Sequence, residues 1–132
     1  MIIARIESFI LNKGLDDAMR RAKKYVDAGA DGIMIHSKSK KPNEVFSFSK
    51  KFKKIFSDIP LICVPTSYNQ IYENELLKNG FNVVIYANQL LRSAYPAMYK
   101  TAYSILEHER AFEADRDLMS IQEILNLIPG TV

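Results

Sequence analysis

The chain has 132 residues, 48% of them hydrophobic, and a formal net charge of +3 from 18 basic and 15 acidic side chains. This length and composition are typical of a single compact domain and exclude a disordered chain. They also exclude a complete barrel of eight β/α units, which needs roughly 200 to 250 residues.

Four strand-and-helix units follow one another along the chain. Short apolar, β-branched runs predict strands near residues 2–7, 32–36, 61–65 and 81–87. Apolar residues at helical spacing predict helices near residues 15–28, 42–56, 70–78 and 89–110. After a charged turn, Ser120 and Glu123 have the spacing of a capping box that starts a last short helix.

This alternation predicts an α/β fold, with a parallel sheet covered by helices on at least one face. Four units can form a small, doubly wound open sheet or half of a closed barrel. No G-x-G-x-x-G or G-x-x-x-x-G-K-[ST] phosphate loop follows any predicted strand, but periodicity leaves both architectures open. We expect a β/α part over residues 1–110 and a C-terminal helical extension over residues 111–132.

The charge is unevenly distributed, with +6 in residues 1–60 and −3 in residues 61–132. The Lys50 to Lys54 cluster alternates with phenylalanines at helical spacing, which favours a solvated basic face over a nucleic-acid surface. Cys63 is the only cysteine and lies in an apolar run, which indicates a buried thiol and a reducing compartment. No stretch has the roughly 20 apolar residues of a membrane span. We therefore expect a cytoplasmic protein without nucleic-acid or membrane partners.

Polar side chains gather where the predicted strands end, which is where both architectures bind ligands. A guanidinium in an apolar strand, such as that of Arg5, needs a carboxylate or a phosphate as partner. Glu7 shares the strand face of Arg5, so an internal ion pair is the simpler alternative to a ligand site. His36 ends the second strand and can donate to an anionic oxygen or move a proton. The other rim candidates are Ser37, Thr66 and Asn88.

The sequence predicts no metal-ligand set. Asp16 and Asp17 begin a helix, and Asp115 and Asp117 lie in a turn, where solvated caps are favoured over a Mg²⁺ site. His108 lies near the end of a predicted helix, and no Cys/His zinc pattern is present.

Five segments, in this order and at this spacing, carry a family resemblance. They are IARIESF at 3–9, GLDDA at 14–18 with RA at 21–22, AGADGIMIHSK at 28–38, VPT at 64–66, and VIYAN at 84–88 with LR at 91–92. Together they resemble the C-terminal half of the phosphoenolpyruvate phosphomutases, in the isocitrate lyase superfamily. The resemblance implies a (β/α)₈ barrel whose rim binds phosphoenolpyruvate or phosphonopyruvate with Mg²⁺. Such an isomerase moves the phosphoryl group between oxygen and carbon, which begins phosphonate biosynthesis.

The resemblance also implies roles for individual residues. Arg5 and His36 stand at the family's phosphoryl-contacting positions and become the catalytic and substrate-binding candidates, with Glu7 orienting Arg5 or water. Ser37, Thr66 and Asn88 are further substrate-binding candidates. The acidic cluster that binds Mg²⁺ in the family and its gating loop have no counterpart in this chain. We therefore expect a C-terminal fragment, natural or artificial, that is inactive alone.

Other functions stay open at this point. Phosphonopyruvate hydrolases and carbon–carbon lyases share the superfamily scaffold, and a half barrel that binds phosphate or assembles without catalysis is a further alternative. A half barrel leaves strand edges and apolar faces uncovered. The family also exchanges its last barrel helix between subunits. We therefore expect a homo-oligomer, formed by self-association or by helix swapping.

Overall fold

The computed structural model describes residues 1–128 and 130, which form two compact units divided after Ala87. The first unit contains β1 (Ile3–Ile6), α1 (Gly14–Asp27), β2 (Gly32–Ile35), α2 (Asn43–Ile55), β3 (Leu61–Cys63), α3 (Glu73–Lys78) and β4 (Val83–Val84). The second contains α4 (Gln89–His108), the 3₁₀ turn η1 (Asp115–Asp117) and α5 (Ile121–Asn126). The predicted strands and helices are therefore all confirmed.

Two elements are at least three residues shorter than predicted. β4 has two residues and starts after Asn82, whose side chain accepts the Leu61 N–H at 2.9 Å in place of a backbone carbonyl. α3 begins at Glu73 rather than near residue 70, because the preceding residues form turns, one of them closed by a bond from the Ile71 N–H to the Tyr68 carbonyl. Both differences lengthen the loops around the sheet.

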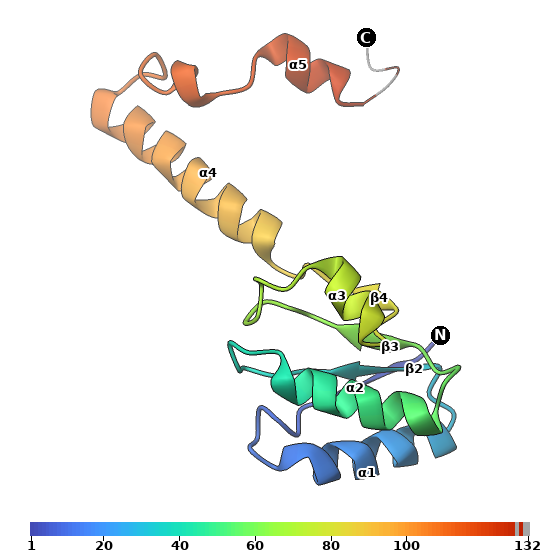
Figure 1. Cartoon of the computed structure of the whole chain (residues 1–132). Coiled ribbons are helices and arrows are strands. Elements are labelled where there is room, and N and C mark those ends of the chain that lie inside the picture. Colours follow the sequence, from blue (N-terminus) through green and yellow to red (C-terminus); the bar gives the residue numbers. More distant parts are fainter. Residues whose placement is uncertain (129, 131–132) are drawn as a thin grey trace. The chain divides into compact units, whose positions relative to one another are not determined.

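The sheet settles the choice between the two architectures. Its four strands are parallel and lie in the order β1-β2-β3-β4, with α1, α2 and α3 following one another across it in chain order (Figure 1). A doubly wound sheet reverses its strand order at a switch point, whereas successive units in a barrel do not. The order is therefore that of a segment of a (β/α)₈ barrel.

One hydrophobic core lies between the helices and one face of the sheet. Its strand residues occupy matching register positions, such as Ile6, Ile35 and Cys63, so the helices all cover the same face. The rings of Phe48 and Phe52 stack with centroids 5.5 Å apart and are fully buried. The basic face of α2 therefore turns outward, as predicted. Burial also raises the pKa of the Cys63 thiol to about 12, which makes it a structural thiol.

The opposite face of the sheet is left uncovered by the helices of the first unit and positions the candidate site. Arg5 on β1 pairs in register with Met34, and Met34 with Ile62, which places the three side chains in one row across this face. Gly32 lies one row lower, where a Cβ would come within 2.7 Å of Cδ1 of Ile3 and 3.2 Å of Cδ1 of Ile62. The absence of a side chain at Gly32 lets these two isoleucines approach each other.

The second unit consists of helices and turns. Ser120 and Glu123 form the predicted capping box at the start of α5. No residue of α4 is buried, and Tyr95, Tyr99 and Tyr103 stack along it with successive centroids 6.5 Å apart. The division after Ala87 comes earlier than the boundary expected at residue 110, because α4 groups with the residues that follow it. Residues 129, 131 and 132 of the expected extension lie outside the described residues.

None of the helices in the described part of the chain combines the length and the apolar character that crossing a membrane requires.

Candidate functional site

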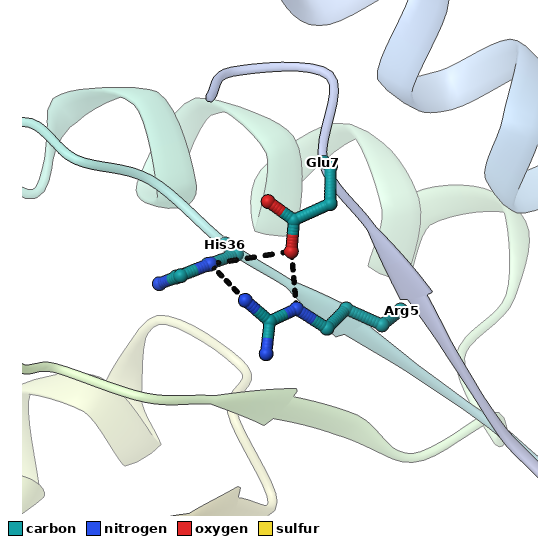
Figure 2. Close-up of polar contacts among 3 residues, drawn as sticks. All are labelled: Arg5, Glu7 and His36. Atoms are coloured by element: carbon teal, nitrogen blue, oxygen red, sulfur yellow. Dashed lines mark hydrogen bonds and ion pairs between the residues drawn. The ribbon is translucent and has the colours of Figure 1, made fainter. Parts of the chain in front are cut away.

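Arg5, Glu7 and His36 converge at the carboxyl ends of two neighbouring strands (Figure 2). Arg5 belongs to β1, Glu7 follows this strand directly, and His36 follows β2 directly. The parallel ladder continues one step beyond β2, where the His36 N–H donates to the carbonyl of Ile6 at 3.3 Å. This bond holds His36 beside the end of β1 and brings the three side chains onto the uncovered face.

The three side chains form a closed set of contacts. Nε of Arg5 donates to Oε1 of Glu7, and Nη2 of Arg5 lies 2.6 Å from Nδ1 of His36. The same Glu7 oxygen lies 3.3 Å from Nδ1 of His36. The exposed fractions of the Arg5, Glu7 and His36 side chains are 52%, 35% and 23%. The expected Arg5–Glu7 ion pair is thus present, but it does not bury the guanidinium, which stays half accessible to a ligand.

The contact between Arg5 and His36 assigns the imidazole tautomer. A guanidinium has only donors, so Nδ1 of His36 must accept, and the proton of the neutral ring must lie on Nε2. Nε2–H is then a donor directed away from Arg5. Protonating the ring would place a second donor on Nδ1, which would repel Arg5 and turn the bond toward Glu7. The neutral ring therefore fits this arrangement, and its Nε2–H stays available to donate to a ligand.

Glu7 supplies the negative charge of the set. Partial burial raises the pKa of its carboxyl, but the contacts of this carboxyl with the Arg5 guanidinium and the His36 ring outweigh burial, and the net pKa lies below the ordinary value. Glu7 is therefore ionised at neutral pH and offsets the charge of Arg5. A phosphoryl oxygen approaching this place would meet the remaining N–H groups of Arg5 and the Nε2–H of His36.

The other predicted site residues lie in different surroundings. Ser37 is 1% exposed, donates to Oε2 of Glu44 at 2.5 Å and accepts from the Ser39 N–H at 3.0 Å. Its hydroxyl is therefore engaged inside the loop after β2. Thr66 lies in the loop after β3 and is partly exposed, and its backbone N–H donates to the carbonyl of Val64. Asn88 is the first residue of the second unit and is not placed relative to Arg5.

Two bonds that sequence reasoning missed link the loops at this end of the sheet. Nζ of Lys38 donates to the carbonyl of Ile10 at 3.1 Å, and Nε2 of Gln70 donates to the carbonyl of Lys40 at 2.7 Å. They connect the loop after β2 with the loops after β1 and β3. Backbone acceptors leave no signature in a sequence, so no pattern could have predicted these partners.

The residues present do not form a Mg²⁺ site by themselves. Within residues 1–128 and 130, no three histidine, cysteine or carboxylate side chains lie close enough together to hold a metal ion. The carboxylate of Glu7 already accepts from Arg5. A Mg²⁺ ion needs several oxygen ligands, and the described residues do not bring them together.

Comparison with known proteins identifies the family. The family model for phosphoenolpyruvate phosphomutase matches residues 1–106. Phosphoenolpyruvate phosphomutase of Tetrahymena pyriformis is 37% identical over 126 residues, which cover 96% of this chain and 41% of the relative. Phosphonopyruvate hydrolase of Variovorax sp. (strain Pal2) is 36% identical over 128 residues, with coverage of 96% and 43%.

A solved structure agrees with these matches. The crystal structure of phosphoenolpyruvate phosphomutase from Streptomyces platensis subsp. rosaceus superposes with a TM-score of 0.86 at 35% identity, over 96% of this chain and 43% of that one. The chain thus spans less than half the length of the relatives it matches. The expected fold class, four β/α units of a (β/α)₈ barrel, is confirmed by this likeness and by the strand order. The chain belongs to the phosphoenolpyruvate phosphomutase family.

Proposed function

We propose that this chain supplies the phosphoryl-binding part of a site that interconverts phosphoenolpyruvate and phosphonopyruvate. The observation that carries the proposal is the convergence of Arg5 and His36, 2.6 Å apart, at the carboxyl ends of two parallel strands. This is the end of the sheet where barrels of this class place their active sites. Membership of the family supports the choice of substrates.

The isomerisation requires a site that stabilises the phosphoryl anion at a fixed position. In the isomerisation, the bond between phosphorus and the enol oxygen breaks and a bond between phosphorus and carbon forms, with no net change in composition. The electron pair of the broken bond passes to the enol oxygen, which becomes a carbonyl as the neighbouring carbon bonds to phosphorus, and the three phosphoryl oxygens carry negative charge throughout. The free N–H groups of Arg5 and the Nε2–H of His36 can hold these oxygens while the carbon skeleton changes position, because both donors are already oriented.

The proposal assigns no Mg²⁺ ligand to this chain. The family resemblance implies Mg²⁺, yet the described residues bring no ligand set together. Arg5 and His36 would act on the phosphoryl group, and a metal ion would have to be held by groups other than the ones described. We also keep a cytoplasmic location in the proposal, which the free, buried thiol of Cys63 supports.

Phosphorus NMR of the purified chain with phosphonopyruvate, with and without Mg²⁺, tests the proposal. We expect the phosphonate resonance to shift on binding, and the shift to disappear in Arg5→Ala. The matched control is Arg116→Ala, which removes an exposed arginine of the second unit. Absence of any shift at millimolar ligand, or a shift that Arg5→Ala retains, would contradict the assignment.

The same experiment separates a second candidate, phosphonopyruvate hydrolysis. The observation that favours it is the 36% identity to a phosphonopyruvate hydrolase, which nearly equals the identity to the phosphomutase. In hydrolysis, water adds to phosphorus, the phosphorus–carbon bond breaks, and the carbon leaving group takes a proton to give pyruvate and phosphate. Any turnover would contradict the expected inactivity of the isolated chain. Formation of phosphoenolpyruvate would then indicate the mutase, and release of inorganic phosphate the hydrolase.

We further propose that the chain forms a homo-oligomer. Val83 and Ile85, at the last strand of the sheet, are 45% and 36% exposed, and α4 has no buried residue. Exposed apolar surface on this scale is typical of interaction surfaces. Light scattering at micromolar concentration should therefore give a mass above 15.1 kDa, and a monodisperse monomer would contradict this proposal.

A further inference from the structure

Two serines occupy equivalent places in the first two β/α units. Ser8 directly follows Glu7, and Ser37 directly follows His36. Both are 1% exposed. Each hydroxyl donates to a carboxylate near the start of the next helix: Ser8 to Oδ2 of Asp17 at 2.8 Å, and Ser37 to Oε2 of Glu44 at 2.5 Å. The same contact thus occurs twice, each time beside a residue of the candidate site.

The position of the serines connects the helices with the site. Successive side chains at the end of a strand point to opposite faces of the sheet. Glu7 and His36 lie on the uncovered face, so Ser8 and Ser37 point toward the face that the helices cover. A bond that fixes either serine to its helix also fixes the peptide that carries the preceding site residue. The helices can therefore set the direction in which Glu7 and His36 project.

The first of these contacts is reinforced by charge. Nε of Arg21 donates to the same Asp17 oxygen at 2.7 Å, and Arg20 donates to its other oxygen. The bonds from Arg21 and from Ser8 lower the pKa of Asp17 to about 2, so the acceptor is ionised at neutral pH. Asp17 thus joins the loop after β1 to two positions on α1.

The second contact is reinforced by the backbone. The Ser37 hydroxyl also accepts from the N–H of Ser39 at 3.0 Å, which closes the loop after β2 around it. The neighbouring Lys38 then reaches the carbonyl of Ile10 in the loop after β1. The two loops are thereby held at one spacing.

We propose that Ser8–Asp17 and Ser37–Glu44 are positioning pairs, through which α1 and α2 hold Glu7 and His36 in the geometry that lets Arg5 select the Nε2–H tautomer. The inference rests on the proposed function for its purpose, because a phosphoryl group needs that Nε2–H. Its test reads the imidazole directly and requires no turnover.

Nitrogen-15 NMR of the imidazole rings in the whole chain provides the readout, because protonated and unprotonated ring nitrogens resonate far apart. We expect His36 to show an unprotonated Nδ1 and a protonated Nε2. In Ser37→Ala and Glu44→Ala, the two resonances should move toward each other as the tautomers mix. His108 is an internal reference, since it lies in the second unit and its Nδ1–H donates to the carbonyl of Ser104.

Two variants separate positioning from general stability. Glu44→Gln keeps an oxygen acceptor for Ser37 and should restore the His36 signals of the parent chain. Ser49→Ala removes another fully buried serine, one that donates to the carbonyl of Asn79 far along the chain from the site. It should lower the stability and leave the His36 signals unchanged.

The outcomes distinguish this inference from the proposed function. Unchanged His36 signals in Ser37→Ala and Glu44→Ala would overturn it, as would a change of equal size in Ser49→Ala. Because Glu44 is exposed, Glu44→Ala remains informative where Ser37→Ala fails to fold. Phosphonopyruvate binding that depends on Arg5, together with His36 signals that are unchanged in Ser37→Ala and Glu44→Ala, would support the proposed function and contradict the positioning pairs.

Discussion

The guanidinium of Arg5 donates to Nδ1 of His36 across the boundary between β1 and β2, at 2.6 Å. This single bond decides which nitrogen of the ring carries the proton. Arg5 thus uses two different nitrogens for its two partners: Nε donates to Glu7 and Nη2 donates to His36. The remaining N–H groups of the guanidinium can bind an anion without breaking either contact.

We predict that Arg5→Lys weakens phosphonopyruvate binding although it keeps the charge. An ammonium group cannot donate to Glu7, His36 and a ligand from one rigid plane. Loss of one charge-assisted hydrogen bond amounts to about 1.4 kcal/mol, or about a tenfold loss of affinity. A titration followed by phosphorus NMR measures this, with Arg116→Lys as control. Equal affinity in Arg5→Lys and the parent chain would show that the fork geometry is unimportant.

Glu7 gives a prediction that separates its charge from its role as a hydrogen-bond acceptor. Glu7→Gln keeps an oxygen that accepts from Arg5 and removes a negative charge beside the incoming anion, so we expect tighter binding, by about 1 kcal/mol or fivefold. Glu7→Ala removes the acceptor that orients Arg5, so we expect weaker binding than in Glu7→Gln. The same NMR titration ranks the three proteins. If both variants bind alike, Glu7 does not orient Arg5.

The sequence could predict that Arg5, Glu7 and His36 lie close together, but not the contacts that support them. Arg5 and Glu7 share a strand face by simple alternation, and His36 ends the neighbouring strand, so their convergence follows from a parallel sheet. The bond from Ser37 to Glu44 depends on how a seven-residue loop folds back onto the start of α2. Ser37 was therefore predicted as a rim residue, whereas its hydroxyl is engaged below the rim.

A second limit of the sequence concerns strand length and pairing. The apolar run at residues 81–87 predicts a full strand, but the side chain of Asn82 takes the place of a backbone carbonyl opposite Leu61, and β4 contains only Val83–Val84. Hydrophobic periodicity cannot show such a competition between side chain and backbone. The choice between an open doubly wound sheet and a barrel segment likewise needed the strand order, which periodicity does not contain.

The Asp17 carboxyl makes stability depend on acid pH. Hydrogen bonds from Arg21 and Ser8 lower its pKa from an ordinary 3.8 to about 2. A pKa that is lower in the folded than in the unfolded chain stabilises the fold above the unfolded value, and this stabilisation is lost as the pH falls toward 2. We predict that Asp17→Asn is less stable than the parent chain at pH 5 and that the difference shrinks between pH 4 and pH 2. Urea denaturation at several pH values measures it, and a difference that does not depend on pH would contradict the ion pair.

The close approach of Ile3 and Ile62 over Gly32 predicts a coupled pair of substitutions. A Cβ at Gly32 would lie 2.7 Å from Cδ1 of Ile3, so Gly32→Val should destabilise the fold by about 1 to 3 kcal/mol. Ile3→Ala removes the obstructing atom, so the double variant should lose less stability than the two single losses together. Denaturant unfolding of the four proteins completes the cycle. Additive losses would mean that Gly32 is required for a reason other than Ile3.

The tyrosines of α4 provide the test of self-association. Tyr95, Tyr99 and Tyr103 are 64%, 62% and 56% exposed and stack along one side of a helix that has no buried residue. A charge in the middle of this row opposes its burial against a second chain, because an unpaired carboxylate is costly to desolvate. We predict that Tyr99→Glu shifts the mass measured by light scattering toward the monomer. Ala94→Glu, at an exposed position of α4 next to Tyr95, adds the same charge outside the row and should leave the mass closer to that of the parent chain. A Tyr99→Glu variant that associates as the parent chain does would place the contact elsewhere, with the uncovered face of the sheet as the next surface to substitute.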